Sequence, residues 1–232
     1  MRLCNNMFAK KALQWYLCTM DELEVTTSSI AIPKDRNLDL DSLKALAHPL
    51  RVKILDTLST YGCFTASGLA ERLGESSGAT SYHLRQLEKH GFVQEVEDRG
   101  TGRERWWERT PGGINIGSDE AMESAAGREA ATMVFRQFNE GQQNLLIEFV
   151  EHGTEVLPKE WIENSAVSTT NTRLTPPQMR ELLKAWEQLY ATYLYKFKNQ
   201  TAPGSRPVQV QFNAFPVLDG DVTPDEPDGE GE

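Results

Sequence analysis

The chain has 232 residues and a formal net charge of −10, with 39% hydrophobic and 25% charged residues. These proportions are ordinary for a globular protein of one or two domains, and no apolar run approaches the roughly 20 residues that span a bilayer. Residues 1–20 lack an apolar segment followed by a small-residue cleavage site, so we expect no signal peptide and a cytoplasmic protein.

Residues 1–37 are mostly polar and include TTSSIAIPKD, which is typical of a linker. Two alternatives remain open for this segment. It is either disordered or loosely docked, or it forms a short helix that packs on the body through Phe8, Leu13, Trp15 and Leu17.

The three cysteines, Cys4, Cys18 and Cys63, show no C-x-x-C spacing, so we expect neither a disulfide framework nor a zinc site. Cys63 has two interpretations, a small buried hydrophobic residue or a redox-sensitive thiol.

The segment from Asp41 to Ser59 predicts an amphipathic helix, capped by Asp41 or Ser42. Pro49 within it predicts a kink or a break near His48. Its apolar positions are Leu43, Leu46, Ala47, Leu50, Ile54, Leu55 and Leu58.

Two short helical patterns then flank a turn. The first, Ser67–Leu73, stops at Gly74, a residue that readily takes the left-handed conformation ending a helix. The second, Ser77–His90, can be capped by Ser76 or Ser77. The buried side of the second helix is predicted to carry Thr80, Leu84, Leu87 and Gly91. This spacing is typical of a helix-turn-helix, whose second helix enters the DNA major groove.

The opposite face of the second helix has small residues near its start and polar or cationic residues later, which suits a groove. An ordinary solvated face is the alternative. Arg85 is expected to contact a phosphate or a guanine edge, and His83 to pack or to bind phosphate. The predicted DNA-contacting residues on this helix are Ser77, Gly78, Tyr82, Arg85 and Lys89, flanked by Ala79, Ser81 and Gln86.

Two strand-like runs, Phe92–Val96 and Arg103–Arg109, surround a turn at residues 98–102 and predict a basic hairpin, or wing. Trp106 and Trp107 are adjacent in a strand and therefore point to opposite faces, so one of them should join the core. The residues expected to contact the DNA backbone are Arg99, Arg103 and Arg105.

Three segments, LKALAHPLRVKILDTL, LAERLGESSGATSYHLRQLEKHGFV and RERWWER, together resemble the winged helix-turn-helix of ArsR-type transcriptional regulators, in the subgroup with an extended C-terminal region. The resemblance covers roughly residues 41–110. It implies a homodimer that binds a pseudo-palindromic operator on double-stranded DNA, with repression as the default.

Metal sensors of this family carry a cysteine pair in the first helix of the motif, or acidic and histidine ligands in the C-terminal helix. Here the helix Ser67–Leu73 has no cysteine, and His152 is the single histidine of the C-terminal half. We therefore expect no metal and no other cofactor.

After a break at Thr110–Gly113, a long helical pattern runs from Ser118 to about His152 with an apolar stripe. The stripe either packs on the C-terminal region or, as the family's habit implies, forms a two-fold dimer contact. Both can hold on different faces.

Two segments, Ser165–Leu174 and Val208–Phe215, alternate like strands around a helix that starts at Thr175–Pro177. This strand-helix-strand unit resembles the dimerisation or effector domain of related regulators. Its aromatic residues belong to a core or line an effector pocket; they are Trp161, Trp186, Tyr190 and Tyr193.

The acidic charge is unevenly distributed. Between Lys44 and Thr110 there are ten Lys or Arg and nine Asp or Glu, so this region is +1 and the rest is −11. Residues 217–232 hold seven acidic and no basic residues and are expected to be disordered. This tail either aids solubility or folds over the basic face and competes with DNA.

The predicted fold class is α+β, mainly helical: an N-terminal winged helix-turn-helix, a long helix and a small strand-helix-strand C-terminal domain. The expected divisions are a flexible segment 1–37, a DNA-binding domain 38–110, a linker 111–117, a dimerisation or effector domain 118–216 and an acidic tail 217–232.

No G-x-S-x-G, H-E-x-x-H or P-loop motif occurs, so we expect no enzyme. The expected partners are double-stranded DNA, a second copy of the chain and an unknown small-molecule effector, without a membrane. The alternative is a winged-helix module that binds protein and has no specific affinity for DNA.

Overall fold

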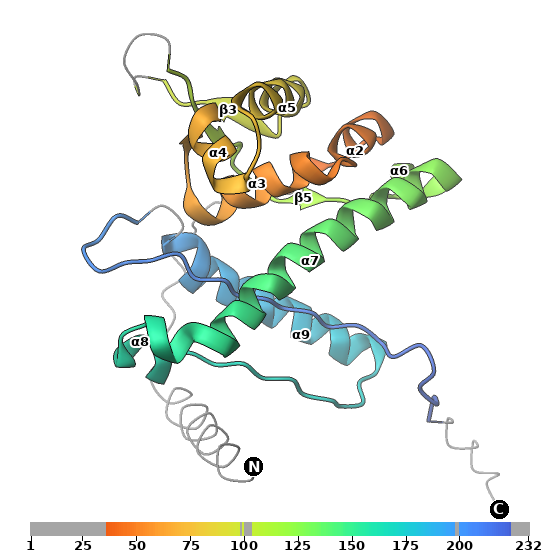
Figure 1. The fold of residues 1–232 in the computed structure, drawn as a ribbon. Helices are drawn as coiled ribbons and strands as arrows, with labels where there is room; N and C mark the ends of the chain where they lie inside the picture. The colour runs from red at the N-terminus through yellow and green to blue at the C-terminus, as the bar shows by residue number, and fades with distance from the viewer. Residues whose placement is uncertain (1–35, 98, 100–103, 198–199, 224–232) are drawn as a thin grey trace, which may run out of the picture.

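A computed structural model describes residues 36–97, 99, 104–197 and 200–223 of the chain (Figure 1). Three sets of expectations lie outside these residues and stay predictions. They concern residues 1–35 with Cys4 and Cys18, the hairpin tip with Arg103, and the acidic tail beyond residue 223.

The predicted helix over residues 41–59 is divided into α2 (Leu40–Leu46) and α3 (Pro49–Tyr61). The break lies at His48, as predicted, because Pro49 has no N–H to continue a helix but fits its first turn. His48 caps α3, since its Nδ1 accepts a hydrogen bond from the backbone N–H of Leu50 (3.2 Å). The cap of α2 is Asp39 rather than Asp41 or Ser42; its Oδ1 accepts from the backbone N–H of Ser42 (2.8 Å).

The helix-turn-helix has the predicted form. Its first helix, α4 (Ala66–Leu73), ends at Gly74 with φ of +69°. The second, α5 (Ser77–Lys89), is capped by Ser76, whose hydroxyl accepts from the backbone N–H of Ala79 (3.2 Å). Thr80 is fully buried and donates its hydroxyl hydrogen bond to the carbonyl of Ala66 (2.8 Å), which fixes α5 against the start of α4.

The wing is an antiparallel pair, β3 (Val93–Glu95) and β4 (Trp106–Arg109), in which Val93 lies opposite Arg109. A third strand, β2 (Phe64–Thr65), pairs with the other edge of β4. The sequence gives no sign of β2, because two residues are too few to show alternation. Trp107 is buried and Trp106 is half-buried, which confirms that the two rings face opposite sides of the sheet.

The segment after the wing forms β5 (Ile114–Asn115), which pairs in parallel with β1 (Arg36–Asn37). The helical pattern after it is divided into α6 (Asp119–Glu123) and α7 (Ala125–Val156). The break is at Ser124, whose hydroxyl accepts from the backbone N–H of Gly127 (2.9 Å) and so starts a new helix.

The core joins α2 and α3, the helix-turn-helix, the wing and the first half of α7, which crosses below the winged unit in Figure 1. One face of α7 therefore packs within the same chain. The buried core residues are Leu38, Leu43, Leu46, Leu50, Val52, Ile54, Leu55, Leu58, Leu69, Leu84, Leu87, Phe92, Val93, Trp107, Ala130, Ala131 and Val134.

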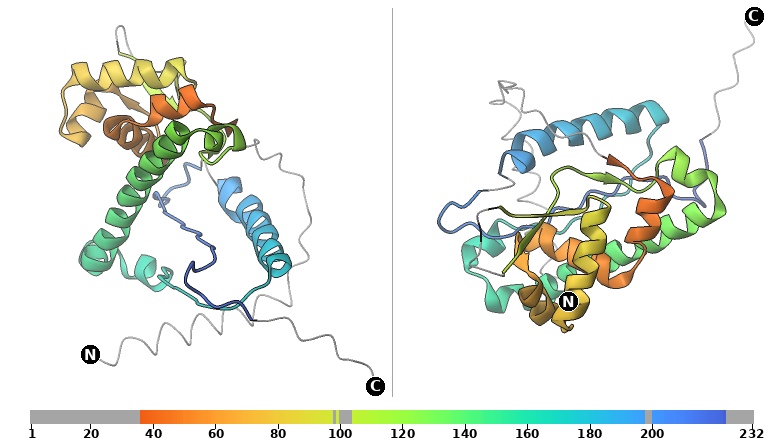
Figure 2. Two further views of the ribbon diagram at one scale, coloured as in Figure 1. Left: turned by 90° about the vertical axis from the view of Figure 1, so that its right-hand side faces the viewer. Right: turned by 90° about the horizontal axis from the view of Figure 1, so that it is seen from above.

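The C-terminal region contains α8 (Lys159–Glu163) and α9 (Pro176–Leu189), which continues as a π-helical turn (Tyr190–Leu194) and a 3-10 turn (Tyr195–Phe197). A capping box between Thr175 and Gln178 starts α9. Figure 2 shows α9 set apart from the winged unit. Among the described ranges, no helix is long and apolar enough to cross a membrane.

The two strands predicted around α9 are wrong, although the helix between them and the mainly helical fold class are correct. Residues 165–174 and 208–215 contain no strand. A strand needs a neighbouring strand for its hydrogen bonds, and the second segment contacts helices instead. The side chain of Gln209 donates to the carbonyl of Gln142 in α7 (3.4 Å), and the ring of Phe212 stacks on Trp186 of α9 with centroids 4.4 Å apart.

Candidate nucleic-acid interface

Helix α5 presents its polar side to solvent because its apolar side is anchored. Thr80, Leu84 and Leu87 are each at most 1% exposed. Roughly opposite this stripe on the helix, Tyr82 is 57% exposed. A tyrosine this exposed is not needed by the core and is free to contact a partner.

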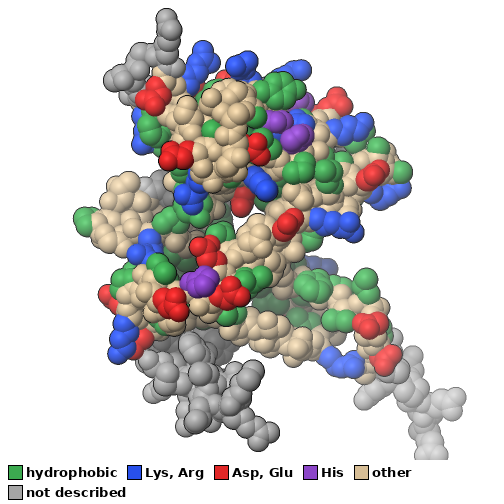
Figure 3. Space-filling view, in the orientation of Figure 1, with side chains coloured by type: hydrophobic (Ala, Val, Ile, Leu, Met, Phe, Trp, Pro, Cys, Tyr) green, Lys and Arg blue, Asp and Glu red, His purple; other side chains and the backbone are tan. Residues whose placement is uncertain are grey.

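The predicted contact residues of α5 lie on the side of the helix away from the core, as the helical periodicity predicts. Ser77, Gly78, Tyr82, Arg85 and Lys89 are exposed, and the flanking residues Ala79, Ser81 and Gln86 are half-buried. Lys and Arg side chains gather along the top of the molecule in Figure 3, over α5 and the wing. The exposed residues thus form one continuous polar face, which we call the α5 face.

Arg36 holds the end of α5 in place from outside the helix. Its guanidinium donates to the carbonyl of Gly91 (3.2 Å) and lies over the ring of Phe92 (4.9 Å). Gly91 has φ of +66°, and a Cβ added there would lie 2.9 Å from Nη1 of Arg36. The left-handed backbone favours glycine, and a Cβ at this position would also require the guanidinium of Arg36 to shift.

The wing arginines are held by neighbours of different kinds. The guanidinium of Arg99 lies over the ring of Trp106 (4.1 Å) and donates to Sγ of Cys63. Arg105 forms an exposed ion pair with Glu95 (3.6 Å), of a kind that contributes little to stability and is readily exchanged for a phosphate. Arg103 lies outside the described residues.

A cluster of two histidines and an arginine borders the α5 face, and sequence reasoning did not assemble it. The rings of His48, at the start of α3, and His83, on α5, have centroids 4.4 Å apart. Arg51 of α3 lies near both. The pKa of His48 is lowered mainly by burial and also by the charge of Arg51. The pKa of His83 is lowered mainly by burial, and further by His48 and Arg51.

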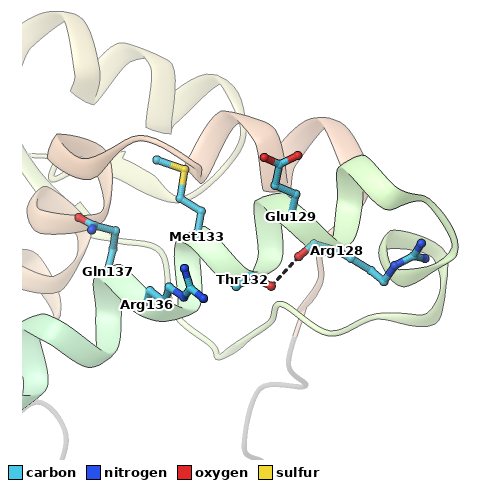
Figure 4. Close-up of a pocket in the computed structure, with 6 residues that line it drawn as sticks. All are labelled: Arg128, Glu129, Thr132, Met133, Arg136 and Gln137. Atoms are coloured by element: carbon cyan, nitrogen blue, oxygen red, sulfur yellow. Dashed lines mark hydrogen bonds between the residues drawn. The ribbon is translucent and has the colours of Figure 1, made fainter.

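The described residues form a hollow on α7 but assemble no metal site. No group of three or more His, Cys, Asp or Glu side chains among them is placed to hold a metal ion. A hollow of about 450 Å³ lies on α7, where Thr132 donates to the carbonyl of Arg128 (2.8 Å) (Figure 4). All its lining residues come from α7, so no second helix or strand helps to enclose a ligand there. They are Arg128, Glu129, Thr132, Met133, Arg136 and Gln137.

Comparisons with known proteins agree with the fold of the winged unit. Residues 46–96 match a family model described as a helix-turn-helix domain. The comparison with curated proteins found no match. The chain thus contains a winged helix-turn-helix.

Three solved structures illustrate the similarity. The transcriptional repressor BigR from Xylella fastidiosa is 22% identical, with a TM-score of 0.26, over 40% of this chain and 76% of that chain. Reduced HlyU from Vibrio cholerae is 23% identical, with a TM-score of 0.27, over 41% of this chain and 83% of that chain. The third is the homodimeric winged helix-turn-helix DNA-binding domain Mb0332 from Mycobacterium bovis, a possible ArsR-family regulator. It is 23% identical, with a TM-score of 0.27, over 49% of this chain and 82% of that chain.

Proposed function

We propose that this protein is a sequence-specific DNA-binding transcriptional regulator of the ArsR type, acting as a homodimeric repressor. The observation that carries the proposal is the α5 face. The second helix of a winged helix-turn-helix presents Tyr82, Arg85 and Lys89 to solvent, while its other side is buried. A helix exposed in this way matches the width and hydrogen-bonding edges of the DNA major groove.

In this proposal α5 lies in the major groove and the wing lies over the adjacent backbone. Arg85 reads a guanine edge or holds a phosphate, and Arg99, Arg103 and Arg105 hold phosphates beside it. The small residues Ser77, Gly78 and Ala79 let the start of α5 approach the bases closely, with Ser81 and Gln86 at its edges.

The homodimer is supported by apolar side chains that stay exposed outside the winged unit. Phe135, Ile147 and Val150 of α7 are 62%, 51% and 63% exposed. Symmetric two-fold dimers are the commonest oligomers. We place the DNA-binding function in residues 38–110 and dimerisation, with any response to a small-molecule effector, in residues 118–216. A two-fold dimer requires a pseudo-palindromic operator with half-sites about 34–36 Å, or a multiple of this, apart.

The test is selection of duplexes from a random DNA library by the purified chain at a stated salt concentration. We expect enrichment of a pseudo-palindrome. Arg85→Ala should weaken binding to the selected duplex by about tenfold or more, because a direct contact to a base or phosphate is lost. Arg180→Ala, which removes an exposed arginine of α9, is the control and should bind like the parent chain.

A failed selection would support the other candidate, a winged-helix module that binds protein. The balance of charges over residues 44–110, +1 in total, is compatible with it. A module of that kind has no salt-dependent DNA affinity for Arg85→Ala to reduce.

A further inference from the structure

The cluster of His48, Arg51 and His83 has polar groups that the fold does not satisfy. Nε of Arg51 and Nδ1 of His83 are both buried, and neither hydrogen-bonds to any residue that the structure describes. Burial lowers the pKa of Arg51, so its charge is held where water solvates it poorly. A desolvated cation without a counter-charge is costly, and native proteins seldom retain one without a role.

The cluster lies at the edge of the α5 face. His83 follows Tyr82 in α5, and their rings meet edge to face with centroids 5.1 Å apart. Histidine side chains reach the surface beside α5 in Figure 3. A partner that covers the ring of Tyr82 therefore also reaches the cluster.

The chemistry of the three side chains fits an oxyanion. Nδ1 of His48 accepts from the backbone of Leu50, so the proton of its neutral ring is on Nε2, where it can be donated. Arg51 supplies a guanidinium, which recognises phosphate oxygens through charged hydrogen bonds. All three side chains can donate, and none carries a negative charge.

We propose that His48, Arg51 and His83 form a binding site for one phosphate of the DNA backbone, filled when the duplex lies on the α5 face, and that His83 takes up a proton as it fills. The site deepens the proposed DNA-binding function and rests on it. From the sequence we expected His83 to pack or to bind phosphate, but neither His48 nor Arg51 was predicted to contact DNA.

Proton uptake follows from the charges around His83. In the free protein burial, His48 and Arg51 lower its pKa, and Glu75 acts in the opposite direction. A bound phosphate adds negative charge beside the ring, favours the imidazolium and raises the pKa of His83. Between the lower and the higher pKa, binding DNA also binds a proton, so affinity should rise as pH falls from about 8 to about 6.

The first experiment measures the affinity of the full chain for its selected duplex across a salt series. Arg51→Gln should weaken binding about tenfold and reduce the slope of log K against log salt by about 1, because one phosphate contact is lost. Lys53→Gln removes an exposed charge from the same helix and is the matched control. It should keep the parent slope.

The second experiment follows affinity against pH at constant salt. His83→Gln keeps a hydrogen-bonding side chain but cannot be protonated in this range, so its affinity should change less with pH than that of the parent. His152→Gln, on the exposed side of α7, should keep the parent dependence. If Arg51→Gln does not fold, the comparison of His83→Gln with His152→Gln decides the proposal.

The outcomes separate the two proposals. If the parent chain shows no salt-dependent DNA affinity, the proposed function is wrong and the phosphate site falls with it. If the parent binds, but Arg51→Gln keeps its salt slope or His83→Gln keeps its pH dependence, only the phosphate site is wrong. A loss of affinity without a change of slope also contradicts the site, because a purely structural role for Arg51 produces that result.

Discussion

At the scale of single residues, one hydroxyl joins the two helices of the helix-turn-helix. Thr80 has no exposed surface, and its Oγ1 lies 2.8 Å from the carbonyl oxygen of Ala66, fourteen residues earlier in the chain. Its other contacts, with the carbonyls of Ser76 and Ser77, are local to α5. The contact with Ala66 is therefore the one that sets the position of α5 against α4.

Thr80→Val should lower the free energy of unfolding by about 1–2 kcal/mol, because a methyl group replaces a buried donor and leaves its acceptor with fewer partners. Urea denaturation followed by circular dichroism measures the change. The control is Thr132→Val, which removes a hydroxyl bonded to the carbonyl of Arg128 on the exposed side of α7. A change beyond about 0.5 kcal/mol there, or none for Thr80→Val, would contradict this role for the buried hydroxyl.

At the scale of elements, the turn between α4 and α5 depends on one backbone conformation. Gly74 has φ of +69°, and a Cβ added there meets no atom within 4 Å. The requirement for glycine is thus purely conformational. Gly78, four residues later in the first turn of α5, has equal space around it but ordinary helical dihedrals.

Gly74→Ala should lower the free energy of unfolding by about 1 kcal/mol, the cost of placing a side chain in the left-handed region. Gly78→Ala should instead raise it, by up to about 1 kcal/mol, because alanine loses less backbone entropy in a helix. Thermal unfolding of the two variants measures both changes. Equal effects of the two substitutions would show that the turn does not constrain Gly74.

At the scale of the whole molecule, α9 is an amphipathic helix with too little to pack against. All fourteen of its residues are described, and each is at least partly exposed. Leu182, Leu183 and Leu189 on its apolar side are 39%, 41% and 45% exposed. Helices of this length gain most of their stability in water from tertiary packing, so in the proposed homodimer we expect α9 to lie in the contact between the two copies.

Leu183→Glu should shift the chain from dimer to monomer at micromolar concentration, because a charge replaces a leucine within the proposed contact. Sedimentation equilibrium measures the change in molar mass. Gln188→Glu adds the same charge on the polar side of α9 and should leave the dimer intact. A parent chain that is monomeric, or a Leu183→Glu variant that stays dimeric, would remove α9 from the interface.

The sequence by itself determined the winged unit well, because the signals that define it are local. Caps, the stop at Gly74 and the spacing of Thr80, Leu84 and Leu87 act within a few residues of each other, so both helices appeared with nearly their observed bounds. The alternation around Trp106 and Trp107 likewise predicted a strand and one buried ring, but it did not show that Trp107 is the buried one.

Only the tertiary structure decided what depends on residues far apart in the chain. A strand exists only if a partner lies beside it, so β1 and β5 form from two residues each, while the alternating segment 208–215 contacts helices and forms none. The contact between the rings of His48 and His83 likewise forms only because α3 packs against α5. The two residues are too far apart in the chain for a local sequence pattern to predict it. Hydrophobic periodicity shows which face of an element is apolar, but not which element covers it.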